Sequence, residues 1–257
     1  MGLEQATVTE SALANMPEVV QRYMRFMGVV GRPRDWSVLA HLKGQFRPSP
    51  ELPWMQAECF QYDNALEVAR FFYMRIMFYG VLPVYARDVY LHGSGHMQGK
   101  ALNVATVVDE KGPEIAIGEL VTFLNDAILL APSMLIGLAT TWKQLDADRF
   151  EVGLRNESHA VRAQVTVDAD GAPRTFVTTD RFLQDPYDPA HPLVRAPWST
   201  PIDGYQLAAG RPIPTSAQAQ WHLPKGDFAY ARLAFEASEL SFNVAPNGRS
   251  DHVRASA

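Results

Sequence analysis

The sequence predicts a mostly β protein of the α+β class, with an antiparallel sheet strongly curved around one central helix and a short helix near the N-terminus. Three observations predict this fold. Apolar and polar residues alternate in many short segments, which is the pattern of strands with one buried face. Turn residues such as Gly, Asp and Pro separate these segments at regular intervals. Residues 113–131 form instead a long apolar segment with the period of a helix.

The domain organisation follows from the same pattern. The strand-like segments continue at regular spacing and without a change of composition, which favours one domain over residues 16–242. A chain of 257 residues is long enough to bury a sizeable core. We expect flexible tails at residues 1–15 and 243–257.

The first expected element is a short helix at residues 17–28. Pro17 suits the first turn of a helix, and Gly28 could close it. Apolar residues fall on one face at helical spacing, so we expect this helix to pack on the sheet.

The first half of the chain then changes to the period of two that is typical of strands. Strands are expected at residues 37–44, 54–62 and 70–79, followed by a hairpin of residues 84–92 and 95–102. The third strand carries bulky apolar groups on both faces, so we expect both to be covered. A loop is expected between this hairpin and the central helix.

The second half repeats the β pattern. Asp168-Ala169-Asp170-Gly171 is the clearest hairpin turn in the chain. A loop rich in proline and aspartate is expected at residues 184–197. The expected strands are residues 141–145, 150–155, 160–167, 174–183, 202–207, 215–223 and 228–242.

The central helix is apolar on more than one side. Pro113 suits its first turn and Pro132 ends it. One face is a continuous apolar stripe, whereas the opposite face mixes Glu119 with apolar residues such as Phe123. A helix that lies on one face of a sheet would show solvent a more polar face. We therefore expect the sheet to wrap this helix on more than one side.

Glu119 is the polar residue of greatest interest on that helix. A carboxylate on an enclosed face needs a partner or becomes protonated. Arg75 or Arg87, from the preceding strands, could be that partner. Three roles stay open: a structural ion pair or solvated residue, a general acid or base, and an anchor for a polar group of a ligand.

A heavy load of aromatic and methionine side chains surrounds the third strand and the helix. Such side chains either fill a core or give a ligand pocket large, adaptable contact area. The candidate ligand-binding residues are Phe71, Met74, Phe123, Met134 and Leu135.

Composition and motifs argue against several classes of partner. The net charge is -5 and basic residues are scattered, which disfavours nucleic acid. The lone Cys59 lies in a strand-like run, where a buried apolar role is favoured. His92 and His96 flank a hairpin turn without a further ligand at fixed spacing, so we expect no metal site. No phosphate-binding or nucleophile-elbow motif occurs, and we expect no cofactor.

The sequence also bears on location. No uncharged apolar run reaches the length of a membrane span, and the N-terminal residues lack the regions of a secretory signal. We therefore expect a cytoplasmic protein without an integral membrane segment.

Several motifs together resemble an uncharacterised bacterial family, a domain of unknown function. The resemblance covers roughly Met16 to Phe242. Its motifs are Met16-Pro17, Val20-x-Arg22-Tyr23, Gly28-Val29-Val30-Gly31-Arg32-Pro33, Arg87-Asp88-x-Tyr90, Gly93-x-Gly95-x-Met97, Val107-Val108-Asp109, Gly112-Pro113-Glu114, Gly118-Glu119-Leu120 and Trp221-x-Leu223-Pro224-x-Gly226-x-Phe228-x-Tyr230.

This resemblance implies an incomplete β-barrel with a helical plug, similar to bacterial lipoprotein-carrier folds that hold acyl chains in a concave sheet. It implies no reaction. The chain departs from the family in two places. Leu124-Asn125-Asp126 stands where the family carries Leu-Ala-Glu, and Leu129-Leu130-Ala131-Pro132 replaces an aromatic and proline stretch. A site that uses the missing glutamate therefore differs here.

Three functions follow as hypotheses. The first is binding of a hydrophobic or aromatic small molecule between the concave sheet and the helix. The second is a cofactor-independent lyase, isomerase or hydrolase that acts on such a ligand. Glu119 would be its acid or base, Arg87 would stabilise negative charge, and Tyr73 or Tyr85 would donate a hydrogen bond. The third is an interaction module that uses the loop of residues 184–197.

Overall fold

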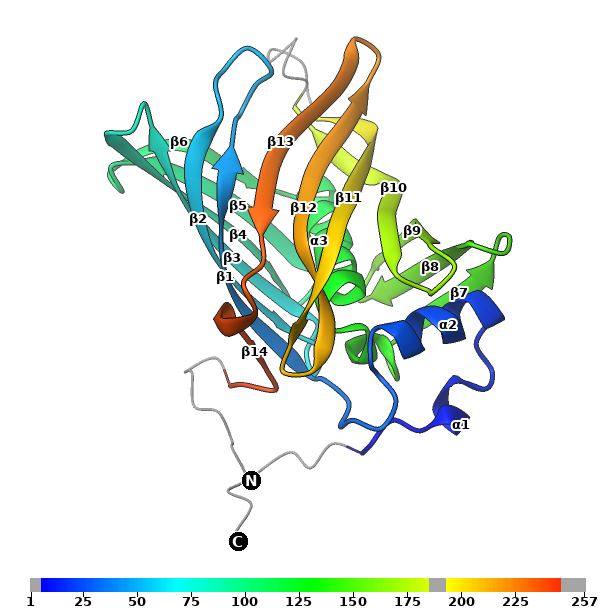
Figure 1. Ribbon diagram of the computed structural model, residues 1–257. Coiled ribbons are helices and arrows are strands. Elements are labelled where there is room, and N and C mark those ends of the chain that lie inside the picture. Colours follow the sequence, from blue (N-terminus) through cyan, green and yellow to red (C-terminus); the bar gives the residue numbers. More distant parts are fainter. Residues whose placement is uncertain (1–5, 185–192, 246–257) are drawn as a thin grey trace, which may run out of the picture.

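The computed structural model describes residues 6–184 and 193–245 (Figure 1). Within these residues, a 14-stranded antiparallel sheet curls around the helix α3 (Pro113–Leu130). The strand order is β6-β5-β4-β3-β2-β1-β13-β12-β11-β10-β9-β8-β7, and β14 pairs with β1 beside this path. This architecture confirms the expected fold class, a strongly curved sheet or incomplete barrel around a central helix.

The first arm of the half-barrel runs from β1 to β6 as consecutive hairpins. Its strands are β1 (Ser37–Phe46), β2 (Met55–Asn64), β3 (Ala69–Phe78), β4 (Leu82–Leu91), β5 (Ser94–Ala101) and β6 (Ala105–Lys111). The prediction of a loop before the central helix was wrong, because β6 occupies most of this segment. Every residue of β6 is exposed, so no buried face imposes an alternating pattern on its sequence.

The second arm runs from β7 to β13 in the same manner. Its strands are β7 (Thr140–Gln144), β8 (Arg149–Asn156), β9 (His159–Val167), β10 (Pro173–Leu183), β11 (Val194–Ala208), β12 (Arg211–Leu223) and β13 (Gly226–Ala234). β11 begins inside the expected loop of residues 184–197, of which residues 185–192 lie outside the described part. The last expected strand is divided, since η2 (Ala237–Glu239) separates β13 from β14 (Leu240–Phe242).

The two arms join where β1 pairs with β13, in a register that runs from Lys43 opposite Ala234 to Phe46 opposite Ala231. Gly44 lies in this seam, and a Cβ atom there would collide with the backbone carbonyl of Arg232. Glycine therefore permits the close approach of the two arms at this position.

The two ends of the described chain pack against the half-barrel. The expected short helix is confirmed as α2 (Glu18–Phe26), and the Tyr23 hydroxyl donates a 2.8 Å hydrogen bond to the Ile128 carbonyl of α3. The expected N-terminal tail contains α1 (Glu10–Leu13), whose Leu13 is buried. Near the other end, Val244 is buried and hydrogen-bonds to Ser37. The remaining tail residues, 1–5 and 246–257, lie outside the described part.

The helix α3 is enclosed by both arms, as Figure 1 shows. Its buried residues lie on all sides of the helix, which confirms that the sheet wraps it on more than one side. Gly95 of β5 contacts it so closely that a Cβ atom there would lie 2.5 Å from the Ala116 Cα atom. A short 3-10 helix, η1 (Pro132–Leu135), follows α3 and is buried as well. Among the described helices, none has the length and apolar character needed to cross a membrane.

The third strand differs from expectation on its outer face. Phe72, Met74 and Ile76 of β3 are buried on the concave side, but Tyr73 on the convex side is 48% exposed. The prediction that both faces of this strand are covered was therefore wrong. Only the concave face meets the helix and the other arm.

Candidate functional site

A cavity of about 920 Å³ lies between α3 and the concave face of the sheet, and it is partly open to solvent. Its volume falls within the roughly 300–1,000 Å³ range of small-molecule sites in proteins. Both arms and the helix contribute to its walls. The apolar wall includes Leu42, Phe46, Phe72, Met74, Ile76, Leu129, Leu130, Trp198, Trp221 and Tyr230.

Arg70 forms the centre of a buried charge cluster on the helix side of the cavity. Its Nη1 donates to Glu119 Oε2 at 2.9 Å, and its Nε donates to Asp126 Oδ2 at 2.8 Å. Asp63 Oδ1 lies 4.0 Å from the Arg70 Nε. The guanidinium also lies over the Phe72 ring, 4.8 Å from its centroid. This cluster fixes the middle of α3 to β3.

Burial has a large effect on the acids of this cluster. Burial, followed by the charge of Asp126, raises the pKa of Asp63 well above its ordinary value. Burial also raises the pKa of Asp126, although the charge of Arg70 and its hydrogen bond act in the opposite direction. The Gln61 side chain donates a 2.6 Å hydrogen bond to the Asp63 carboxyl group.

The prediction that Arg75 or Arg87 is the partner of Glu119 was wrong. Arg75 points to the convex side of β3, where it binds Glu58 at 2.6 Å. Arg87 contacts His96 at 3.4 Å. Arg70 takes the role because it precedes Phe72 and Met74 on the concave side, at the two-residue spacing of a strand.

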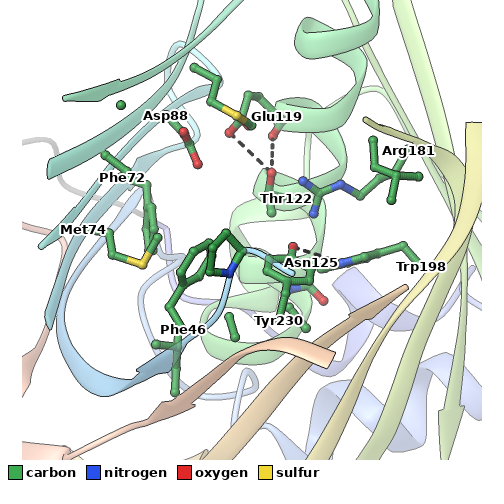
Figure 2. A pocket seen from close by; sticks show the side chains of 18 of the residues that line it. Phe46, Phe72, Met74, Asp88, Glu119, Thr122, Asn125, Arg181, Trp198 and Tyr230 are labelled. Atoms are coloured by element: carbon green, nitrogen blue, oxygen red, sulfur yellow. Dashed lines mark hydrogen bonds between the residues drawn. The ribbon is translucent and has the colours of Figure 1, made fainter. Parts of the chain in front are cut away.

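Asp88 of β4 lines the cavity and points from the sheet toward the helix (Figure 2). Among the described residues, none donates a hydrogen bond to its carboxylate. Burial and then the charge of Glu119 raise the pKa of Asp88 to about 7, against the lowering effects of Arg70 and Arg181. Asp88 therefore changes its charge near neutral pH, although the sequence pattern did not indicate it as a site residue.

Arg181 of β10 lines the opposite side of the cavity. Its guanidinium lies 4.5 Å from the ring centroid of Trp198 and 5.5 Å from that of Trp221. Figure 2 shows it pointing from the sheet toward α3, beside Thr122. Its Nε and Nη1 atoms are buried and have no hydrogen-bond partner among the described residues, and the same holds for Asn125 Oδ1 and Thr200 Oγ1. Several polar groups of the cavity are thus left without a partner by the described chain.

Three of the sequence-predicted residues gather on the other side of the sheet. Tyr73, Tyr85 and Arg87 surround a smaller pocket of about 300 Å³ on the convex face. Tyr73 lies opposite Arg87 in the ladder between β3 and β4. Glu119 lines the main cavity instead. The structure thus brings Tyr73, Tyr85 and Arg87 together but separates them from Glu119.

The sequence-predicted ligand-binding residues are also divided. Met74 lines the main cavity. Phe71 lies on the convex side of β3, where its ring is 6.4 Å from that of Tyr62. Phe123, Met134 and Leu135 are buried in the apolar core, and none of these three is among the described residues that line the cavity.

Comparison with known proteins gives one structural match and one family. The crystal structure of a LolA superfamily protein from Nitrosomonas europaea matches with a TM-score of 0.44 and 10% sequence identity, over 96% of this chain and 100% of that chain. No curated protein matches the sequence significantly. The profile of a family of unknown function, DUF6544, matches residues 6–233, which include the motifs from Met16 to Tyr230. This chain belongs to the family of unknown function DUF6544.

Proposed function

We propose that this protein binds a hydrophobic small molecule in the cavity between α3 and the concave sheet. The observation that carries this proposal is the volume of about 920 Å³ that the side chains of both arms leave open. Its wall is mainly aliphatic and aromatic, so an apolar ligand would leave water on entering it. Each square ångström of apolar surface removed from water contributes about 25 cal/mol.

Binding of a neutral fluorescent probe tests this proposal. N-phenyl-naphthylamine fluoresces more strongly in an apolar site, and its displacement reports binding by other molecules. The purified, delipidated protein should enhance its fluorescence, and a panel of fatty acids, aromatic compounds and terpenoids should contain compounds that displace it. If neither the probe nor any member of the panel binds, the proposal is wrong.

A matched pair of substitutions locates the binding site. Ala217 of β12 lines the cavity, so Ala217→Phe should fill part of it and weaken probe binding by roughly tenfold or more. Ala234 of β13 is exposed, so Ala234→Phe adds the same side chain to the surface and should leave probe binding unchanged. Equal effects of the two substitutions would place the probe outside the cavity.

A cofactor-independent enzyme acting on such a ligand is a second candidate, and the position of Asp88 favours it. A general acid or base works best when its pKa is near the working pH, and Asp88 faces the cavity with a pKa of about 7. Glu119, the acid or base expected from the sequence, already accepts a hydrogen bond from Arg70. Each bound compound should therefore be followed for conversion. Asp88→Asn should then lower turnover by about 100-fold or more, and unchanged turnover would exclude Asp88 from that role.

A further inference from the structure

We propose that Arg181 binds the carboxylate of the ligand, so that the cavity takes a long-chain or aromatic carboxylic acid. This inference rests on the proposed binding function and adds the chemical class of the ligand. It starts from the polar atoms that the described chain leaves without partners, and from the difference between two buried arginines.

No counterion among the described residues lies in direct contact with the buried Arg181. The residue is 7% exposed, and its Nε and Nη1 atoms have no hydrogen-bond partner in the part of the chain that the structure describes. The rings of Trp198 and Trp221 attract the cation through their faces. They supply no acceptor oxygen, and a buried charge without hydrogen bonds is costly. An anionic ligand group in the cavity would remove this cost.

Arg70 provides the contrast. The buried polar residues of the described chain include two arginines, Arg70 and Arg181. Arg70 has Glu119 and Asp126 at hydrogen-bond distance, so its charge is satisfied within the protein. Arg181 lacks such a pair within residues 6–184 and 193–245, although it lines the same cavity. A carboxylate is a suitable partner, because its two oxygens match the planar donors of a guanidinium.

Thr200 adds a neutral donor on the same side of the cavity. It follows Trp198 by two residues along β11, so both side chains lie on one face of the strand. Trp198 is the residue over which the Arg181 guanidinium lies. Thr200 lines the cavity, and its buried Oγ1 has no partner in the described part of the chain. Its hydroxyl can rotate to donate to an anionic oxygen.

The acids that line the cavity could instead attract a cationic ligand, and they are Asp88, Glu110, Glu114, Glu119 and Asp126. A carboxylic acid can meet its burial by taking up a proton. A guanidinium cannot lose its proton at physiological pH. A buried guanidinium therefore requires an anion, whereas a buried carboxylic acid requires no cation. This asymmetry favours a carboxylate over an amine as the polar group of the ligand.

Three molecules with the same chain test the proposal. Hexadecanoate, methyl hexadecanoate and hexadecylamine differ only in the polar group. Their affinities are measured by displacement of the neutral probe, at concentrations below micelle formation. The wild-type protein should bind hexadecanoate roughly tenfold or more tighter than the ester, as expected for a charge-assisted hydrogen bond.

Substitutions then assign the preference to Arg181. Arg181→Met keeps an apolar side chain over the indoles, and it should weaken hexadecanoate binding to the level of the ester while leaving the ester unchanged. Arg181→Lys keeps the charge and should retain part of the preference. Arg195→Met is the matched control, because Arg195 is exposed on the adjacent β11 and pairs with Asp180; it should have no effect. Retained binding of the ester shows that each variant is folded.

The outcomes separate the inference from the function on which it rests. If the acid and the ester bind equally well, or the amine binds best, Arg181 does not select a carboxylate, but the cavity still binds apolar molecules. A preference for the acid that survives Arg181→Met also overturns the inference. If none of the three molecules binds and the probe does not bind either, the proposed function itself fails.

Discussion

Arg70 Nη1 donates a hydrogen bond to Glu119 Oε2 across 2.9 Å, which joins β3 to the middle of α3 inside the half-barrel. The same guanidinium binds Asp126, which lies about two turns further along the helix. The position of α3 against the first arm therefore depends on a buried charge as well as on apolar packing. The cavity lies beside this contact, so its shape depends on the same pair.

We expect Arg70→Met to destabilise the protein by about 3–5 kcal/mol, because it leaves buried carboxylates without their cation. The free energy of unfolding, measured with urea at neutral pH, checks this value. Arg75→Met on the same strand is the control. Its ion pair with Glu58 is exposed on the Arg75 side, and such pairs contribute about 1 kcal/mol or less. Equal losses for the two variants would contradict a structural role for the buried cluster.

Asp88 should make stability depend on pH. Its pKa is about 7 in the folded protein and 3.8 in its ordinary state, so the folded state holds the proton more tightly. Its contribution to stability is therefore lost as the pH rises from 3.8 toward 7. Asn mimics the protonated acid, so Asp88→Asn should raise the unfolding temperature at about pH 8 by roughly 3 °C or more and should have little effect near about pH 4.

A second aspartate gives the control for that experiment. Asp109 lies on the exposed strand β6, and a hydrogen bond from His96 lowers its pKa. Asp109→Asn removes a favourable contact of the charged form and should give no gain in unfolding temperature at either pH. If Asp88→Asn raises the unfolding temperature as much near about pH 4 as at about pH 8, the charge of Asp88 is not the cause of the gain.

Two glycines at α3 should respond to alanine with opposite signs. A Cβ atom on Gly95 would lie 2.5 Å from the Ala116 Cα and 2.7 Å from the Ile115 carbonyl carbon. Gly95→Ala should therefore cost about 1–3 kcal/mol. A Cβ atom on Gly118 meets nothing within 4 Å, so Gly118→Ala should add about 0.5–1 kcal/mol through helix propensity. Denaturant unfolding of both variants measures these changes, and equal signs would contradict the close approach of β5 to the helix.

Carboxylate binding should take up a proton. The pKa of Asp88 is influenced by Arg70 on β3, Glu119 on α3 and Arg181 on β10. Met97, which lies opposite Asp88 on β5, carries no charge. A ligand anion at Arg181 adds negative charge, which raises the pKa of Asp88 further. The affinity for hexadecanoate should therefore fall as the pH rises through about 7.

Calorimetry in two buffers with different ionisation enthalpies measures this proton uptake directly. The methyl ester should bind with the same affinity across the same pH range, because it brings no charge. Asp88→Asn should remove the pH dependence of hexadecanoate binding. If the dependence persists in that variant, another group takes up the proton.

Much of the fold could be predicted from the sequence, because most strands of the half-barrel have one solvent-exposed face and one buried face. The alternation in β1 and β2 and the apolar sides of α3 follow directly from this arrangement. β6 could not be found in this way, because all of its residues are exposed. The long β11 was also underestimated, since Pro197 and Pro201 lie within it and proline disfavours a strand interior.

The site was harder to predict than the fold. Apolar residues occupy both faces of β3, so the alternation did not show whether Phe72 or Tyr73 points inward, and Arg70 was missed as the partner of Glu119. Arg70 lies two residues before Phe72, so the inward direction of Phe72 also places Arg70 on the concave face. Arg181 lies next to a register shift between β10 and β11, and such a bulge changes which residues share a face. Its position therefore required the three-dimensional structure.

The seam between β1 and β13 bears on the order of folding. Each arm is a series of hairpins between neighbours in sequence, which form quickly. The seam instead joins Lys43 to Ala234, residues from opposite ends of the chain, and closing so long a loop is slow. We therefore expect the two arms to collapse separately, and the pairing of β1 with β13 to be a late and rate-limiting step of folding. Substitution of Gly44 should then slow folding.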